Sequence, residues 1–129
     1  MTQEEKQLLL KDLCARLPYN VKVHINGNSN IRTIKGIDLI VTDEGELEYA
    51  ITSLGSSPIE LKYIKPYLRP MSSMTEEEEN EYKDTCVKIN GLNSETSLTF
   101  DWLNEHHFDH RDLIEKGLAL EAPEGMYKF

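Results

Sequence analysis

Hydrophobic and polar positions along the chain first follow the period of an amphipathic helix. Apolar side chains recur there at steps of three and four residues. They are Leu9, Leu10, Leu13, Cys14 and Leu17. Thr2 and Glu5 have the spacing of a capping box, which predicts that the helix begins at this point, and Pro18 predicts its end.

From residue 19 the period changes to two, which is typical of half-buried strands. Val21, Val23 and Ile25 alternate with Lys22 and His24. Turn residues then separate further extended stretches at 31–41, 46–51 and 59–64. Short strands packed into about fifty residues bury their apolar faces by curling into a small barrel. The prolines of 65–70 lack a donor for the sheet, so we expect this segment to leave it.

The second half of the chain has helical features. Hydroxyl side chains precede the glutamates of 76–79, which predicts a short helix to about residue 85, followed by an extended or loop segment over 87–93. A third helix is expected over 97–107, and the apolar stretch 113–123 is expected to pack on the rest. The predicted fold class is therefore α+β. It has an N-terminal helix, a small SH3-like or Sm-like β-barrel, and an acidic, mainly helical C-terminal segment packed on the barrel.

Charge divides the chain near residue 70. Its net charge is -9, yet basic and acidic side chains balance in residues 1–70, whereas 5 basic residues face 14 acidic ones in 71–129. With 129 residues, the two parts fit a single compact unit, 1–70 carrying the helix and barrel and 71–129 the acidic segment. The acidic excess disfavours non-specific nucleic-acid binding.

Composition also predicts an intracellular, cytoplasmic protein that does not enter membranes. No apolar run approaches the ~18 residues of a bilayer span, and the amino end lacks the positive charge of a secretory signal. Cys14 and Cys86 have neither metal-ligand spacing nor a disulfide framework, so we expect both to be buried, reduced thiols.

One cluster has the residue types of a metal site. His106 and His110 are four residues apart, which places two imidazoles on one face of a helix, and Asp109 lies between them. A metal-dependent hydrolase using His106, His107 and Asp109 is therefore one alternative. A solvated helix end or a hydrogen-bonded aromatic platform explains the same residues and is favoured, so no metal and no cofactor is predicted.

The candidate binding residues are aromatic. Tyr63, Tyr67 and Trp102 are suited to an aromatic groove for an extended peptide, with His106 and His107 beside it. Packing in the core is the alternative for these side chains. The chain contains no phosphate-binding loop and no nucleophile motif, so no catalytic residue is predicted.

Three segments resemble an uncharacterised family of small proteins from gut anaerobes, their phages and mobile elements. They read DLCARLPY at 12–19, IKPYLRPMSSMTEEE at 64–78 and GLALEAPEGMY at 117–127. The resemblance implies no activity, ligand or catalytic residue. Tyr and Gly are usual in that family where this chain has His110 and Asp112, which weakens the metal alternative.

The segment RTIKGID at 32–38 is similar to the first motif of Sm-like RNA-binding proteins. That motif begins with glycine where this chain has Arg32, and the isoleucine-arginine-glycine of the second motif is replaced by the tripeptide at 64–66. Both replacements fall where that family closes its ring and binds RNA. The resemblance therefore implies the barrel fold more than RNA binding.

The sequence favours a non-catalytic protein-interaction or accessory module of phage or mobile-element origin, whose partner is another protein. Binding of RNA or DNA through the barrel is the alternative, and a basic face would favour it. That face requires Lys22, Arg32, Lys35, Lys62 and Lys65 to converge in space. The oligomeric state does not follow from the sequence.

Overall fold

The computed structural model describes residues 2–26, 31–42, 45–52, 59–90 and 97–127, and it describes side chains outside 38–52, 86–90 and 97–99. The helices in this part of the chain are α1 (Gln3–Arg16), α2 (Glu76–Asn90) and α3 (Ser97–Glu105). The strands are β1 (Lys22–Ile25), β2 (Arg32–Thr42), β3 (Gly45–Thr52), β4 (Ile59–Glu60), β5 (Ile64–Leu68) and β6 (Leu120–Glu121). Single 3₁₀ turns occupy Leu17–Tyr19, Leu61–Tyr63 and Met71–Ser73. The predicted α+β class is confirmed.

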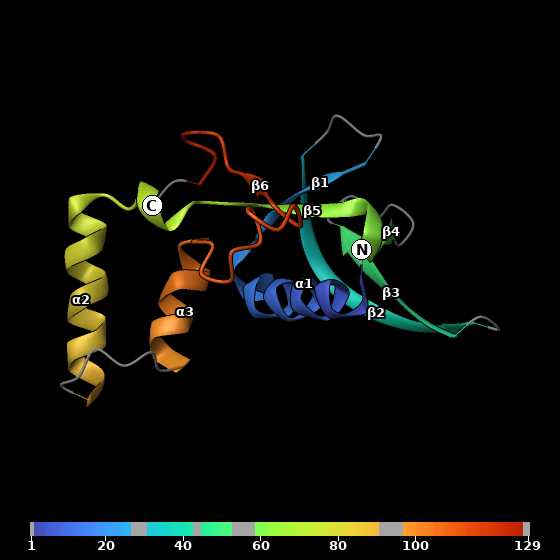
Figure 1. Cartoon of the computed structure of the whole chain (residues 1–129), viewed down its shortest axis with the longest axis horizontal. Coiled ribbons are helices and arrows are strands. Elements are labelled where there is room, and N and C mark those ends of the chain that lie inside the picture. The colour runs from blue at the N-terminus through green and yellow to red at the C-terminus, as the bar shows by residue number, and fades with distance from the viewer. Residues whose placement is uncertain (1, 27–30, 43–44, 53–58, 91–96, 128–129) are drawn as a thin grey trace.

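The strands form one sheet in the order β4-β3-β2-β1-β5-β6. The pairs from β4 to β5 are antiparallel, and β6 joins β5 in parallel, with Tyr67 opposite Leu120. β2 and β3 continue beyond the other strands as a ribbon that projects from the body of the protein (Figure 1). Within the described residues the sheet is open, since β4 and β6 form its two ends and do not pair with each other. A closed barrel is therefore not seen.

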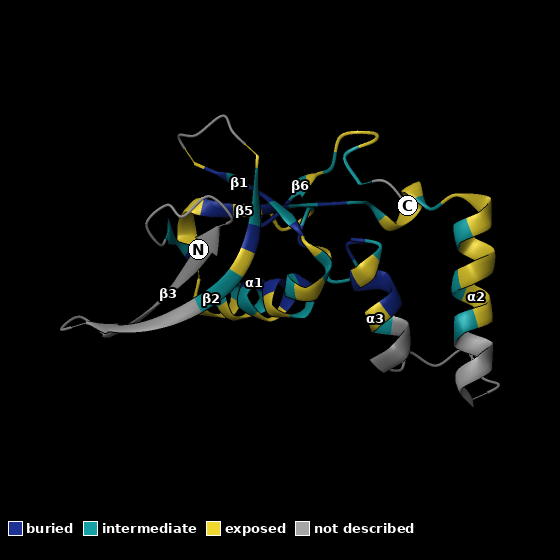
Figure 2. Cartoon of the chain, turned by 180° about the vertical axis from the view of Figure 1, so that it is seen from behind, coloured by how far each residue is buried: buried dark blue, intermediate teal, exposed yellow. Residues whose placement is uncertain are grey.

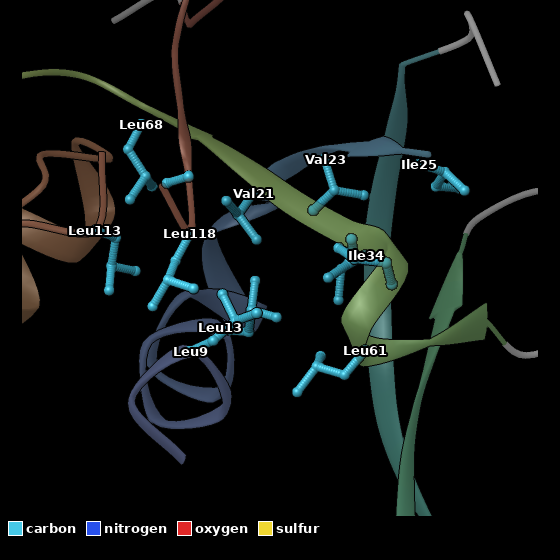
Figure 3. Packing of buried hydrophobic residues seen from close by; sticks show 12 residues of the cluster. Leu9, Leu13, Val21, Val23, Ile25, Ile34, Leu61, Leu68, Leu113 and Leu118 are labelled. Atoms are coloured by element: carbon cyan, nitrogen blue, oxygen red, sulfur yellow. The ribbon is translucent and has the colours of Figure 1, made fainter. Parts of the chain in front are cut away.

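The main core lies between α1 and one face of the sheet (Figure 3). We call this sheet face the inner face and the opposite one the outer face. The buried residues come from α1, β1 and the residue before it, β2, β5 and the loop 113–119, and they include Leu9, Leu13, Val21, Val23, Ile34, Ile64, Leu68, Leu113 and Leu118. The predicted packing of the 113–123 stretch on the rest of the chain is thus confirmed for its first part.

Helix α1 begins as predicted, but its buried face differs from the predicted stripe. The Thr2 hydroxyl accepts from the Glu5 N–H at 3.1 Å, and the Glu5 carboxylate accepts from the Thr2 N–H at 2.9 Å. The buried positions are Leu9, Asp12, Leu13 and Arg16, spaced by three and four residues. Because this face is centred one position away from the apolar stripe, Cys14 is exposed, and its predicted burial is wrong. Cys86 lies outside the residues with described side chains.

A buried ion cluster joins α1 to the C-terminal part of the chain. Arg16 is fully buried and pairs with Asp12, with 2.9 Å between Nε and Oδ2. Its Nη2 donates to the Phe108 carbonyl at 2.6 Å. Arg111 donates to the other Asp12 oxygen, Oδ1, at 2.7 Å. These contacts cross more than ninety positions of sequence, so α1 holds the turn that follows α3.

The prediction that residues 65–70 leave the sheet is wrong for 65–68, because β5 runs through Pro66 to Leu68 and pairs with β1. The backbone N–H of Asn26 donates to the Tyr63 carbonyl at 2.8 Å, so every second residue of β5 from Tyr63 onward faces β1. Pro66 is out of phase with that series, and its nitrogen points to the other edge. A proline there costs the β1 ladder no hydrogen bond.

Helices α2 and α3 lie beside each other, away from the projecting ribbon (Figure 1). Thr75 caps α2 as predicted, accepting from the Glu78 N–H at 3.1 Å. The helix extends to Asn90, so the extended or loop segment predicted from residue 87 is wrong for 87–90, while 91–93 lie outside the described residues. Figure 2 shows mostly exposed and intermediate residues on α2. None of the described helices is long and apolar enough to cross a bilayer.

We predict that Asp12→Asn lowers the free energy of unfolding by about 3 to 5 kcal/mol, because it leaves the Arg16 charge buried beside a neutral side chain. Chemical denaturation measures this loss. The matched control is Asp84→Asn on the exposed surface of α2, which we expect to change stability little. Equal effects of the two substitutions would contradict a structural role of the buried cluster.

Candidate functional site

The structure brings Tyr63 and Tyr67 to one neighbourhood and places Trp102 in another. Tyr67 makes an edge contact with His24, with ring centroids 6.4 Å apart. Tyr63 lines the same small cavity as His24 and is 43% exposed. Trp102 is buried on α3, where its Nε1–H donates to Glu81 on α2 at 2.9 Å. The aromatic groove predicted from these three residues is therefore not assembled.

Trp102 instead belongs to a packed aromatic cluster between α2, α3 and the turn after α3. Its ring stacks on His106 at 4.1 Å and on Phe108 at 5.9 Å, and it contacts Tyr82 at 5.5 Å. Arg69 lies over the Phe108 ring, with its guanidinium carbon 4.2 Å from the ring centroid. Trp102 and His106 are thus packed within this aromatic cluster. Neither lines the cavity beside Tyr63 or the cavity beside Tyr127.

The helical spacing behind the metal alternative is not seen, because α3 ends at Glu105 and His107 has a φ of 61°. The His106 Nδ1 lies 2.9 Å from the Trp102 carbonyl, and the His110 Nε2 lies 2.9 Å from the Asn104 amide oxygen. The Asp109 carboxylate accepts two backbone N–H groups, from residues 113 and 114. Among the described residues, no three histidine, cysteine or carboxylate side chains are placed to hold a metal ion.

The outer face of the sheet collects basic and aromatic side chains. Val21, Val23 and Ile25 are buried on the inner face, so Lys22 and His24 lie on the outer face. The same alternation puts Lys65 and Tyr67 of β5 on the outer face, and Lys65 pairs directly with His24. On β2, Ile34 is buried and Lys35 is exposed. We call this surface the basic face; its residues are Lys22, His24, Lys35, Tyr63, Lys65 and Tyr67.

Two of the five basic residues predicted to converge behave differently from the others. Arg32 pairs with Val23 and therefore shares the inner face. Lys62 stands at the edge of the basic face, where its ammonium lies 5.2 Å from the Tyr63 ring centroid. Its pairing with Glu60 at 3.5 Å raises the pKa of Lys62. No described carboxylate pairs with Lys22, Lys35 or Lys65, and the Lys35 ammonium donates to the Asn20 amide oxygen at 3.1 Å.

A cavity of about 240 Å³ opens on this face. It is lined by His24, Asn26, Lys62, Tyr63, Lys65 and Leu120, from β1, β5, β6 and the 3₁₀ turn before β5. No carboxylate is among these lining residues. The arrangement can hold a negatively charged group beside an aromatic ring.

Tyr127 closes the sheet where β1 and β5 separate. The backbone N–H of Lys22 donates to its hydroxyl at 2.9 Å, and the hydroxyl donates to the Tyr67 carbonyl at 2.8 Å. Burial raises the pKa of Tyr127 to about 12. Its ring stacks on His107, with centroids 3.9 Å apart. A C-terminal side chain thus replaces a missing pair of the ladder and anchors the end of the chain.

His107 is the predicted binding residue with the most perturbed environment. It is 3% exposed, and burial, reinforced by the positive charge of Arg16, lowers the pKa of His107 to about 3. Burial and the charge of Arg111 similarly lower the pKa of His110 to about 4. Both imidazoles are therefore neutral at pH 7.

Sequence reasoning missed His24 and Tyr127 as site residues. The alternation of β1 carries a signal for His24, because it lies out of phase with the buried valines and in phase with Lys22. Tyr127 comes to its position through tertiary contacts, for which the local sequence has no signal.

We predict that Tyr127→Phe destabilises the protein by about 1 to 3 kcal/mol, because a buried N–H and a buried carbonyl lose their partner. Thermal and chemical denaturation measure the change. Tyr63→Phe is the matched control, since the Tyr63 side chain is 43% exposed and its hydroxyl does not join the backbones of two strands. An equal cost for both substitutions would contradict the bridging role of the Tyr127 hydroxyl.

Acid should destabilise the protein through its two buried histidines. The pKa of each is lowered on folding, so the unfolded chain binds protons that the folded chain does not once the pH falls below about 6.5. Stability should therefore fall between pH 6.5 and 5 with a slope of at most ~1.4 kcal/mol per pH unit for each histidine. In His107→Asn, which tolerates the same backbone conformation, that slope should be shallower. An unchanged slope would show that His107 does not contribute.

No protein-family model matches this chain, and neither the curated proteins nor the solved structures contain a significant match. No relative therefore supplies an activity or a ligand.

Proposed function

We propose that this protein is a non-catalytic interaction module that binds a negatively charged partner through its basic face. The observation that carries the proposal is the gathering of Lys22, Lys35 and Lys65 with His24 on the solvent side of one sheet. The chain as a whole has a net charge of -9, so its positive charge is concentrated locally rather than spread over the surface.

The leading partner is an acidic segment of another protein. A cavity beside exposed Tyr63 can take a carboxylate side chain, with Lys62 and Lys65 as donors. The acidic residues of 71–129 would lower the affinity for a long polyanion that extends past the basic face, whereas a short acidic peptide needs to meet only that face. The resemblance to small proteins of phages and mobile elements favours an accessory role for such a module.

A second candidate is single-stranded RNA or DNA. The specific observation is that the rings of Tyr63, Tyr67 and His24 lie among the lysines, since bases stack on exposed aromatic rings while ammonium groups contact phosphates. The nucleic-acid candidate is also favoured by the position of Lys22, Lys35 and Lys65 on one face, with Lys62 at its edge.

We also propose that the sheet is an open relative of the SH3-like or Sm-like barrel. Supporting features are the succession of β1 to β4 as neighbours, the return of β5 to β1, and the register shift in β2 between Ile34 and Gly36, which bends that strand. NMR contacts between amides of β4 and β5 test the closure. Absence of these contacts in solution would agree with the open sheet. Their presence would show a closed barrel and contradict the proposal.

Heparin chromatography tests the basic face directly. We expect retention of the wild-type protein at low salt, despite a sequence pI near 4.9, and loss of retention in Lys35→Glu/Lys65→Glu. The matched control is Lys11→Glu/Lys83→Glu, which changes net charge equally at exposed positions of α1 and α2. If the wild type flows through, or if both double variants lose retention equally, the proposal fails.

Fluorescence anisotropy with a labelled polyglutamate peptide and a labelled single-stranded oligonucleotide separates the two candidates. The leading one predicts that the peptide binds at least about tenfold more tightly at equal salt. Tighter binding of the oligonucleotide, lost in Tyr63→Ala, would assign the basic face to nucleic acid instead.

A further inference from the structure

A second cavity, of about 460 Å³, lies where four distant segments meet. Its walls come from the turn after α1, the start of β1, the end of α3 and the C-terminal segment. The lining residues are Tyr19, Asn20, Lys22, Glu105, His107, Met126 and Tyr127. Of the basic face it shares only Lys22, and its volume is within the ~300–1,000 Å³ common for small-molecule sites.

The floor of this cavity is a fixed aromatic surface. His107 and Tyr127 stack at 3.9 Å, and the Tyr127 hydroxyl is held by the backbones of β1 and β5. His107 is placed by a left-handed backbone with φ 61°, and Asn20, another lining residue, also has a positive φ of 58°. Two non-glycine residues in this conformation at one cavity are uncommon, and such residues concentrate at ligand sites. The floor is therefore preorganised for a flat or apolar group.

The rim of the cavity carries opposite charges that do not neutralise each other. Lys22 supplies a positive charge and exposed Glu105 a negative one, and the two form no ion pair. Burial together with the nearby carboxylates of Asp101 and Glu105 raises the pKa of the Tyr19 phenol, which marks the Glu105 side as the negative end. Separated charges of this kind match a ligand with a cation at one end and an anion at the other.

We infer that this cavity binds a small zwitterion with a planar apolar body, of the class of aromatic amino acids. Its ammonium group would meet Glu105 and the Tyr19 hydroxyl, and its carboxylate would meet Lys22. The planar body would lie over the stacked pair of His107 and Tyr127. The site shares Lys22 with the basic face, and Lys35 of that face donates to the Asn20 amide oxygen at 3.1 Å. Glu105 lies outside the basic face and Lys65 outside this cavity, so either proposal can fail alone.

NMR titration of the full chain with three probes of the same body tests the inference. L-Phenylalanine carries both charges, phenethylamine only the cation and 3-phenylpropionate only the anion. We expect phenylalanine to bind about tenfold more tightly than either of the others, with shifts at the amides of residues lining the cavity. Equal affinity for the three probes, or no binding of phenylalanine, would overturn the inference.

Two substitutions test separately how the cavity recognises the ammonium group and the carboxylate of the ligand. Glu105→Gln is expected to remove the advantage of phenylalanine over 3-phenylpropionate, and Lys22→Met its advantage over phenethylamine. Only the backbone of Lys22 takes part in the Tyr127 bridge, and Glu105 is exposed, so both variants should fold. The control is Glu115→Gln, an exposed carboxylate that does not line the cavity, and loss of binding in this variant would contradict the assignment. Heparin retention of Glu105→Gln should stay unchanged, which keeps this test separate from that of the basic face.

Discussion

The buried guanidinium of Arg16 is the group on which the arrangement of this protein depends. A fully buried charge is tolerated only with close partners, and Arg16 has two of them, the Asp12 carboxylate and the Phe108 carbonyl. The second contact reaches from the first helix to the turn after α3, and Arg111 joins the same carboxylate. One ionic cluster therefore fixes the relation between the sheet with α1 and the C-terminal half of the chain. It also sets the turn that presents His107.

That turn connects the structural cluster with both surfaces to which we assign function. The carbonyl of His107 accepts from the Arg69 N–H at 2.8 Å, so the turn continues the line of β5. His107 also stacks on Tyr127 of the C-terminal segment, and the Tyr127 hydroxyl bridges the backbones of β1 and β5. The basic face and the second cavity thus both border this junction, with Lys22 in common.

Local features of the fold could be predicted from the sequence because their signals are local. The capping box at Thr2 and the alternation over 21–25 depend on neighbours a few residues away, and both are found as expected. Predictions that depended on tertiary contacts did worse. Asp12 and Arg16 read as polar positions of a helix, yet their mutual pairing makes them part of its buried face. Pro66 predicted the end of the sheet, yet its nitrogen faces away from β1, so it removes no hydrogen bond between β1 and β5. The histidines near 106 read as a metal pair only on the assumption of a longer helix, which ends at Glu105.

Hydrogen exchange of the wild type and of Asp12→Asn tests most directly whether one ionic cluster holds the two halves together. We predict that the substitution speeds exchange in residues 103–113 as well as in α1, because the turn loses its anchor when the Arg16 pairing is broken. Faster exchange confined to α1, with protection of 103–113 unchanged, would contradict the claim and show that the turn is held by its own packing.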